Sequence, residues 1–143
     1  MATDAVNDLN ELITLCLDGK HGYQQASENA EGPGLKSFCS EHAAERGRFA
    51  ADLQTAVRGL GGTPTDDGSV TAAFHRGWIG LKDALTGGDT PIVNECVRGE
   101  EHAVKKYQSI LADDDVPAEL KATLSQQHSQ IEQSLTKLKA MAS

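Results

Sequence analysis

The sequence predicts an all-α protein whose helices form a four-helix bundle. Four long segments carry apolar residues at intervals of three and four, a spacing that places them along one face of a helix. Aromatic residues are scarce, at 4% of the chain, and alanine and leucine recur throughout, which favours helices over strands. Because the 143 residues show no change of composition, we expect a single domain over residues 1–143.

Glycine and proline separate the first two predicted helices. The first is expected over residues 4–30 and ends at the EGPG sequence of residues 31–34, where Pro33 can begin the next helix in its first turn. The second helix is expected over residues 33–60, because the GGTP sequence of residues 61–64 breaks it.

The last two predicted helices occupy the second half of the chain. Thr90 is expected to cap the third helix, with Pro91 at its first position, and this helix is expected to run to about Leu111. The fourth is expected from about Pro117 to Met141, with apolar residues at heptad-like spacing. Such spacing is typical of the seam between helices in a bundle.

Residues 65–90 are predicted to form a long crossover between the second and third helices. They contain a polar loop at residues 66–69 and a stretch with helical spacing over residues 70–85. An up-down-up-down bundle would not need this segment, because ordinary bundle connections take about two to eight residues. A long crossover with its own helix, between two pairs of helices, is the connectivity of ferritin-like bundles, in which the second and third helices run parallel.

Charge and hydropathy argue against two classes of partner. Thirteen Lys and Arg residues against twenty-one Asp and Glu residues give a formal net charge of -8, which repels phosphate backbones and anionic lipids. No apolar run approaches the ~20 residues that span a bilayer, and residues 1–8 lack the basic and apolar regions of a signal peptide. We therefore expect no nucleic-acid or membrane partner and a cytoplasmic location.

The three cysteines are odd in number and widely spaced, which supports neither a disulfide framework nor a zinc site. Cys16, Cys39 and Cys96 each fall on a predicted apolar face. We expect them to be buried, free thiols in a reducing compartment.

Motifs spread over nearly the whole chain resemble those of a known family. The motifs are Asp18-Gly19 with Gly22-Tyr23 and Ala26, Leu53-Gln54 with Leu60-Gly61-Gly62, and the run from His75-Arg76-Gly77-Trp78 through Leu81-Lys82 and Leu85-Thr86-Gly87-Gly88-Asp89 to Glu95-Cys96, Arg98-Gly99-Glu100 and Tyr107. Together they resemble a bacterial ferritin-like four-helix-bundle family, domain of unknown function 2383. The resemblance implies the fold and a bacterial origin, and it implies no activity, substrate or catalytic residue.

Polar residues of all four helices are expected at one height, if the first and fourth helices run opposite to the second and third. The set is Lys20 and Gln24, then His42, Glu45 and Arg46, then Glu100, and finally Gln127 with His128. Di-iron bundles build their metal sites at such a level, from a Glu on each of two helices and a Glu-x-x-His pair on each of the other two.

This layer departs from the di-iron pattern. His42 and Glu45 stand in the reverse order, the helix of His128 offers no carboxylate until Glu132, and an inward Lys20 or Arg46 would repel a cation. The alternative that stays open is a single divalent metal ion held by His42, Glu45 and Glu100, with His128 as a further candidate ligand.

The favoured interpretation is a structural polar layer that holds no cofactor. A buried Glu100 then needs a charged partner, either Arg46 or Lys20, and Gln127 is expected to help satisfy the same network. Such a network fixes the register of the helices more than it adds stability.

Two features predict close packing within the bundle. Trp78, with Phe74, Leu81 and Leu85, is expected to anchor the crossover against the long helices. Four glycines inside predicted helices, each costing about 1 kcal/mol relative to alanine, indicate close approach or local bending. They are Gly19, Gly22, Gly47 and Gly99.

No motif assigns the chain to an enzyme class, because it lacks a nucleophile triad, a phosphate-binding loop and a dinucleotide fingerprint. We therefore expect a non-catalytic bundle that acts through its surface or by self-association. The alternative is a metal-binding ferritin-like protein with an atypical site. A weak homodimer is also expected, because the crossover places Ile79 and Leu85 near the surface.

Overall fold

Residues 2–66, 78 and 80–142 are described by the computed structural model, and the regular secondary structure among them is entirely helical. This confirms the all-α class for that part of the chain. The helices are α1 (Ala2–Asn29), α2 (Pro33–Gly59), α4 (Leu81–Ala84), α5 (Asp89–Leu111) and α6 (Ala118–Ala142).

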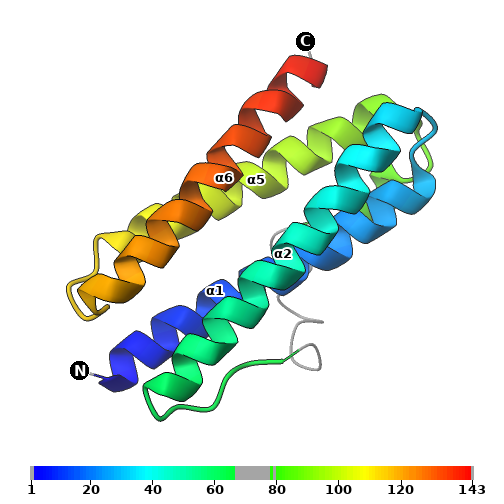
Figure 1. Ribbon diagram of the computed structural model, residues 1–143. Helices are drawn as coiled ribbons and strands as arrows, with labels where there is room; N and C mark the ends of the chain where they lie inside the picture. Colours follow the sequence, from blue (N-terminus) through cyan, green and yellow to red (C-terminus); the bar gives the residue numbers. More distant parts are fainter. Residues whose placement is uncertain (1, 67–77, 79, 143) are drawn as a thin grey trace.

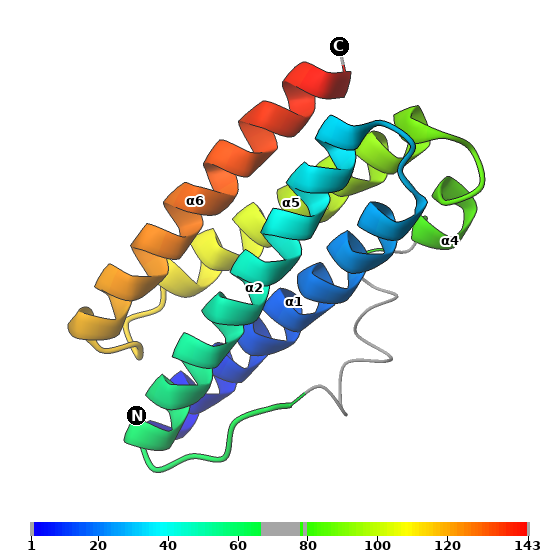
Figure 2. The same ribbon diagram turned by 45° about the vertical axis from the view of Figure 1, so that its right-hand side comes forward.

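The four long helices form two antiparallel hairpins (Figure 1). Helix α1 packs along α2, α5 packs along α6, and the hairpins meet where α1 contacts α5. Helices α2 and α5 run in the same direction, because α2 ends near the N-terminus of the chain whereas α5 begins beside the α1–α2 turn (Figure 2). Residues 60–88 therefore connect opposite ends of the bundle, as the predicted crossover requires.

Helix α2 ends in a turn that glycine permits. Gly61 has a φ of 81°, and its amide donates to the carbonyl of Arg58 at 3.0 Å. The amide of Gly62 donates to the carbonyl of Val57, also at 3.0 Å. This pair of bonds is the Schellman arrangement, which satisfies carbonyls in the last turn of a helix. The predicted stop at residues 61–64 is confirmed.

Helix α5 begins earlier than the sequence predicts. Thr90 is not the cap, because Gly88, with a φ of 89°, precedes the helix and Asp89 is its first residue. The Asp89 carboxylate accepts hydrogen bonds from the amides of Glu31 at 2.7 Å and Gly32 at 2.9 Å. These bonds tie the start of α5 to the α1–α2 turn and lower the pKa of Asp89. A contact between distant segments thus overrides the local cap signal.

The crossover contains α4, which is a single helical turn. Most of the helix predicted over residues 70–85, including Phe74, lies outside the described residues, and so does Ile79. Leu85, expected near the surface, is half-buried and packs against the core. Among the described residues the one large apolar side chain that is exposed is Met141, at 45%. The homodimer therefore stays a prediction.

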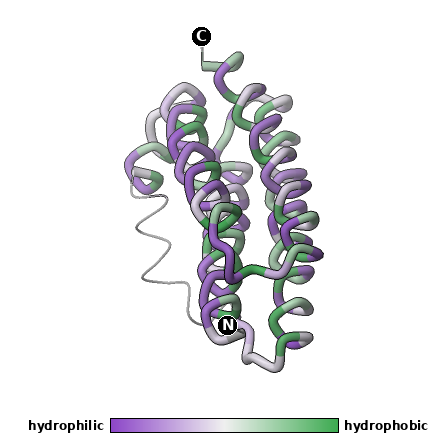
Figure 3. Tube along the Cα trace, turned by 90° about the vertical axis from the view of Figure 1, so that its left-hand side faces the viewer, coloured by the Kyte–Doolittle hydropathy of each residue, from purple (hydrophilic) through white to green (hydrophobic). Residues whose placement is uncertain are grey.

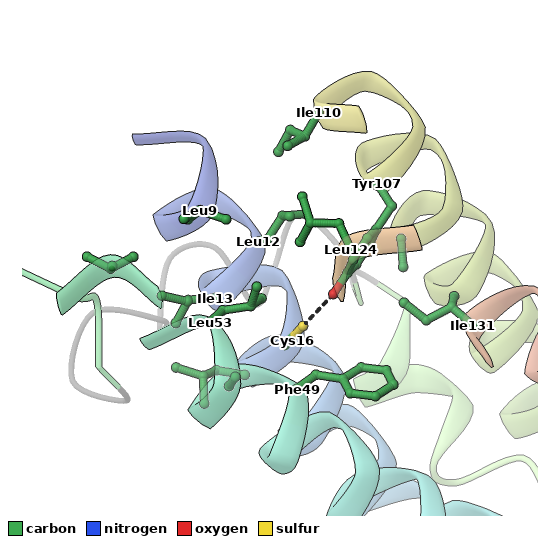
Figure 4. Packing of buried hydrophobic residues seen from close by; sticks show 14 of the residues in the cluster. Leu9, Leu12, Ile13, Cys16, Phe49, Leu53, Tyr107, Ile110, Leu124 and Ile131 are labelled. Atoms are coloured by element: carbon green, nitrogen blue, oxygen red, sulfur yellow. Dashed lines mark hydrogen bonds between the residues drawn. The ribbon is translucent and has the colours of Figure 1, made fainter. Parts of the chain in front are cut away.

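Apolar residues fill the interior in two clusters, one toward each end of the bundle. The first contains Leu12, Leu53 and Ile131 and lies toward the N-terminus and the α5–α6 turn (Figure 4). The second contains Tyr23 and Trp78 and lies toward the α1–α2 turn. Hydrophobic and hydrophilic residues alternate along every long helix in the manner of amphipathic helices, as Figure 3 shows.

No helix in the described part of the chain is both long enough and apolar enough to span a membrane.

Candidate functional site

Arg46 on α2 and Glu100 on α5 form a salt bridge between the two apolar clusters. Along α5, Glu100 lies between Cys96 of one cluster and Ala103 of the other. Arg46 Nη2 donates to Glu100 Oε2, and the two side chains are 2% and 0% exposed. The expected burial of Glu100 is confirmed, and of the two cations predicted as its partner, Arg46 and Lys20, the structure selects Arg46.

Lys20 lies instead on the outer face of the first hairpin. It is half-buried and lines, with Gln24, a groove between α1 and α2. The side chain of Arg46 approaches α1 at Gly19, where an added Cβ would lie 3.2 Å from Arg46 Nη1. This glycine, which the sequence marks as a point of close approach, makes room for the guanidinium group.

Tyr23 on α1 completes what we call the charged centre, which consists of Tyr23, Arg46 and Glu100. The guanidinium carbon of Arg46 lies 5.5 Å from the centroid of the Tyr23 ring, within the range of a cation–π contact. Burial, and after it the Glu100 carboxylate, raise the pKa of Tyr23 well above its ordinary value of 10.0. Burial disfavours the charged form of Arg46, but the Glu100 carboxylate outweighs this and raises the pKa of Arg46. The guanidinium group of Arg46 therefore stays charged at neutral pH, while the phenol of Tyr23 stays protonated.

Among the residues that the structure describes, three atoms of the charged centre have no hydrogen-bond partner of normal geometry. They are Tyr23 Oη, Arg46 Nε and Glu100 Oε1. Leaving a buried polar group unsatisfied costs about 1–3 kcal/mol, so this ion pair stabilises the fold less than a fully bonded one would. Its more important effect is to join α2 to α5 at one fixed height.

A second buried chain of polar groups links three helices in the first cluster. Cys16 Sγ lies 3.2 Å from Tyr107 Oη, the contact drawn in Figure 4, and Tyr107 Oη donates to Gln127 Oε1 at 2.7 Å. Burial raises the pKa of Cys16 to about 11, and burial with the neighbouring thiol raises the pKa of Tyr107. Gln127 thus bonds to Tyr107 rather than to Glu100, the residue whose network it was expected to join.

The two candidate histidine ligands have other neighbours. The ring of His42 stacks on Phe38 with centroids 3.9 Å apart, and His42 Nδ1 lies 2.7 Å from the Phe38 carbonyl oxygen. His128 Nδ1 lies 3.3 Å from Glu132 Oε1, while its Nε2 atom is buried and has no hydrogen-bond partner in the described part of the chain. Both rings are therefore oriented by residues of their own helix.

The two candidate carboxylate ligands, Glu45 and Glu100, have different surroundings. Glu100 is paired with Arg46, whereas Glu45 lines a cleft between α2 and α6, and its buried Oε1 atom has no hydrogen-bond partner among the described residues. Within residues 2–66, 78 and 80–142, no three His, Cys, Asp or Glu side chains are grouped as the ligands of a metal ion would be.

The cysteines are buried, free thiols, as the sequence predicts. In the second cluster, a hydrogen bond to Cys39, together with burial, raises the pKa of Cys96 well above its ordinary value of 9.0. The thiol, rather than the reactive thiolate, is then the form present at neutral pH. Both Cys96 and Cys16 are poor nucleophiles in these surroundings.

Trp78 anchors the crossover in a notch between α1 and α5. It is 4% exposed, and its ring lies 5.3 Å from that of Tyr23. A Cβ at Gly22 would approach the indole to 2.5 Å, and one at Gly99 would approach it to 2.8 Å. The predicted anchoring by Trp78 is confirmed, and two of the intrahelical glycines form the floor of its notch.

Sequence reasoning missed two buried carboxylates. Asp18 on α1 is 3% exposed, and Glu95 on α5 is 7% exposed. Glu95 accepts a hydrogen bond from the amide of Gly80 at 2.9 Å and pairs with Arg98, which fastens the crossover to α5. The spacing of Glu95 and Arg98, three residues apart on a helix, is the one signal that pointed to their pairing.

A comparison with known protein families identifies the family of this chain. Residues 4–113 match the family described as domain of unknown function, DUF2383. The chain belongs to this family. The match includes every residue of the charged centre of this DUF2383 protein and ends just after α5, so Gln127 and His128 on α6 lie beyond it. A search of curated proteins finds no match.

Proposed function

We propose that this DUF2383 protein is a non-catalytic, ferritin-like helical bundle that acts through its surface or by self-association. The observation that carries the proposal is the salt bridge between Arg46 and Glu100. Where a di-iron bundle would hold cations between carboxylates, a guanidinium group neutralises the central carboxylate.

The chemistry of the surrounding groups supports a non-catalytic role. Raised pKa values keep the thiol of Cys16 and the phenols of Tyr23 and Tyr107 protonated at neutral pH. A general base or a nucleophile needs the opposite shift, toward a deprotonated form near pH 7. The buried polar groups are thus suited to holding helices in register.

The direction of the helices supports the ferritin-like part of the proposal. Helices α2 and α5 run parallel, and residues 60–88 connect opposite ends of the bundle. That is the arrangement expected of a ferritin-like bundle with a long crossover. The free cysteines support a cytoplasmic location, and the family resemblance supports a bacterial origin.

Elemental analysis of protein purified without a chelator tests the central part of the proposal. We expect no stoichiometric iron, manganese or zinc in either the wild-type protein or the Glu100→Ala variant. Stoichiometric metal that disappears in Glu100→Ala would show that Glu100 is a ligand and would overturn the proposal.

Metal binding is the second candidate function, and one observation favours it. Glu45 Oε1 and His128 Nε2, both from the predicted ligand set, are buried and lack hydrogen-bond partners within residues 2–66, 78 and 80–142. A metal site on these atoms predicts that Glu45→Gln and His128→Gln each abolish metal uptake, while Arg46→Met increases it because a repelling cation is removed.

Self-association is tested separately by light scattering over a concentration series. A mass that rises toward that of a dimer supports the predicted weak homodimer. A monomer mass at every concentration would leave action through the monomer surface as the proposed mode.

A further inference from the structure

A cluster of carboxyl groups lies where the start of α1 meets the turn between α5 and α6, residues 112–117. The two segments share one end of the bundle (Figure 1). The members of the cluster are Asp8 and Glu11 on α1, and Asp113 and Asp115 in the turn. Glu11 pairs with a cation, since Lys106 Nζ lies 2.7 Å from its Oε2 atom. Asp8 instead forms a hydrogen bond with the carboxyl group of Asp113.

A hydrogen bond between two carboxyl groups requires a proton. An ionised carboxylate can only accept hydrogen bonds, so either Asp8 or Asp113 is protonated while the bond exists. Asp113 is suited to being the ionised partner, because its Oδ1 atom also accepts a hydrogen bond from the amide of Asp115 at 3.0 Å. Asp8 is suited to being the protonated one, because its Oδ2 atom is buried and has no hydrogen-bond partner among the described residues. A negative charge on that atom would be poorly stabilised.

The surrounding charges favour the same assignment. Burial, and after it the neighbouring carboxyl groups of Asp113, Glu11 and Asp115, raise the pKa of Asp8 to about 6. The hydrogen bond from Asp8 and that from the amide of Asp115 lower the pKa of Asp113 below its ordinary value of 3.8, and Lys121 on α6 acts in the same direction. The bond is therefore present in weakly acidic solution and is lost when Asp8 ionises, since two carboxylates repel each other.

This hydrogen bond joins the turn to α1 beside the first apolar cluster. Val116 in the turn is 3% exposed and belongs to that cluster together with Leu9 on α1. The amides of Asp113 and Val116 donate to carbonyls three residues earlier in the chain, so these backbone bonds shape the turn without tying it to α1. The bond between Asp8 and Asp113 connects segments that are more than one hundred residues apart in the sequence.

We propose that Asp8 and Asp113 form a proton-dependent latch, which holds the α5–α6 turn against α1 in weakly acidic solution and releases the turn as the pH rises. Release uncovers the end of the first apolar cluster at Val116 and Leu9. The latch is a conformational device, and it is independent of the salt bridge between Arg46 and Glu100 that supports the proposed function.

The test measures the distance between α1 and the turn in the full-length protein at pH 5 and at pH 8. Nitroxide labels are attached to Asn7→Cys and Ala112→Cys, two exposed positions on either side of the latch. The native cysteines are buried, and protein without the added cysteines controls for their labelling. We expect one short distance at pH 5 and a second, longer distance at pH 8.

The raised pKa of Asp8 sets the size of the expected change. A rise from 3.8 to about 6 lowers the ratio of closed to open molecules about tenfold between pH 5 and pH 8. Screening by solvent can reduce this factor to about threefold, because Asp8 is partly exposed.

Variants of the labelled protein separate the latch from other effects of pH. Asp8→Asn is expected to keep the short distance at both pH values, because its amide donates to Asp113 without titrating. Asp113→Asn is expected to do the same, because its amide donates to the ionised Asp8, and it provides a second test if Asp8→Asn does not fold. Asp4→Asn, which is exposed on α1, is expected to retain the pH dependence of the wild-type protein.

Two results would overturn the proposal. The first is the same distance distribution at pH 5 and pH 8 in the labelled protein that keeps Asp8 and Asp113. The second is an equal pH dependence with and without Asp8→Asn and Asp113→Asn, which would show that another titrating group moves the turn.

Discussion

Arg46 and Glu100 meet at the middle of the bundle with side chains that are 2% and 0% exposed, and they join two helices from different hairpins. Removing one partner of such a pair strands a charge in the interior, whereas exchanging both partners for apolar residues is often neutral. The pair is therefore better suited to fixing which residues of α2 and α5 face each other than to adding net stability.

The notch that holds Trp78 gives a prediction about glycine. Gly22→Ala is expected to destabilise the fold by about 1–3 kcal/mol, because the added Cβ would lie 2.5 Å from the indole ring. Gly34→Ala is the matched control: no atom lies within 4 Å of its added Cβ, so a change between neutral and about 1 kcal/mol of stabilisation is expected. Urea denaturation measures both, and equal effects of the two substitutions would refute the close contact.

Removal of the indole provides a second prediction at the same place. Trp78→Ala is expected to cost about 3–5 kcal/mol, since it leaves a cavity between α1 and α5. In the Trp78→Ala background, Gly22→Ala should no longer destabilise the protein, because its methyl group then fills part of that cavity. A double-mutant cycle measures this coupling, and strict additivity would contradict the packing described above.

The hydrogen bonds of the Asp89 carboxylate predict a contribution to stability that is lost in acid. Its hydrogen bonds to the amides of Glu31 and Gly32 lower its pKa below the ordinary value of 3.8. The contribution is therefore present above pH 3.8 and is lost as the pH falls through the lower, folded-state pKa. Asp89→Ala should melt at a lower temperature than wild type at neutral pH, and this difference should shrink on acidification. Asp83→Ala, an exposed neighbour in α4, serves as the control, and a pH-independent difference for Asp89→Ala would contradict the assignment.

The raised pKa of Asp8 predicts a contribution to stability with the opposite pH dependence. Burial, followed by a hydrogen bond to Asp113, raises the pKa of Asp8 from 3.8 to about 6. The folded protein therefore holds this proton more tightly than the unfolded chain, and the contribution is complete below pH 3.8 and lost as the pH rises through about 6.

Replacing this carboxylate should stabilise the protein above that pH. Asp8→Asn can still donate a hydrogen bond to Asp113, so it is expected to gain up to about 1 kcal/mol at pH 7 to 8, a small value because solvent screens this partly exposed site. The gain should vanish near pH 4. Asp4→Asn, on the same helix and exposed, controls for the change in net charge. Chemical denaturation across this pH range decides the matter, and destabilisation by Asp8→Asn at pH 8 would refute the prediction.

The sequence predicts the long helices well because local signals mark their ends. The breaks at residues 31–34 and 61–64 separate α1, α2 and the crossover, as glycine and proline require. The start of α5 could not be read in the same way, because Asp89 bonds to amides more than fifty residues away. A cap signal at Thr90 was present, but a contact that only the fold creates took precedence.

The sequence predicted that the candidate site contains a buried charge, but it did not determine which residues bond to one another there. Heptad position alone indicated that Glu100 is buried and needs a cation, but helical spacing could not decide between Arg46 and Lys20, which lie at the same height on neighbouring helices. The burial of Glu95 and the bond from Gln127 to Tyr107 depend on where the crossover and α6 pack. Such tertiary contacts leave no periodic trace in the sequence.

The central claim is that a structural ion pair occupies the middle of the bundle, and the free energy of unfolding of Arg46→Met tests it most directly. We predict a loss of about 3–5 kcal/mol that added manganese, zinc or iron does not restore, and recovery of most of this loss in the double variant Arg46→Met with Glu100→Leu. Lys20→Met, on the outer face, should change stability by only about 0–1 kcal/mol. Unchanged stability of Arg46→Met without metal, together with marked stabilisation when one of these metals is added, would contradict the claim.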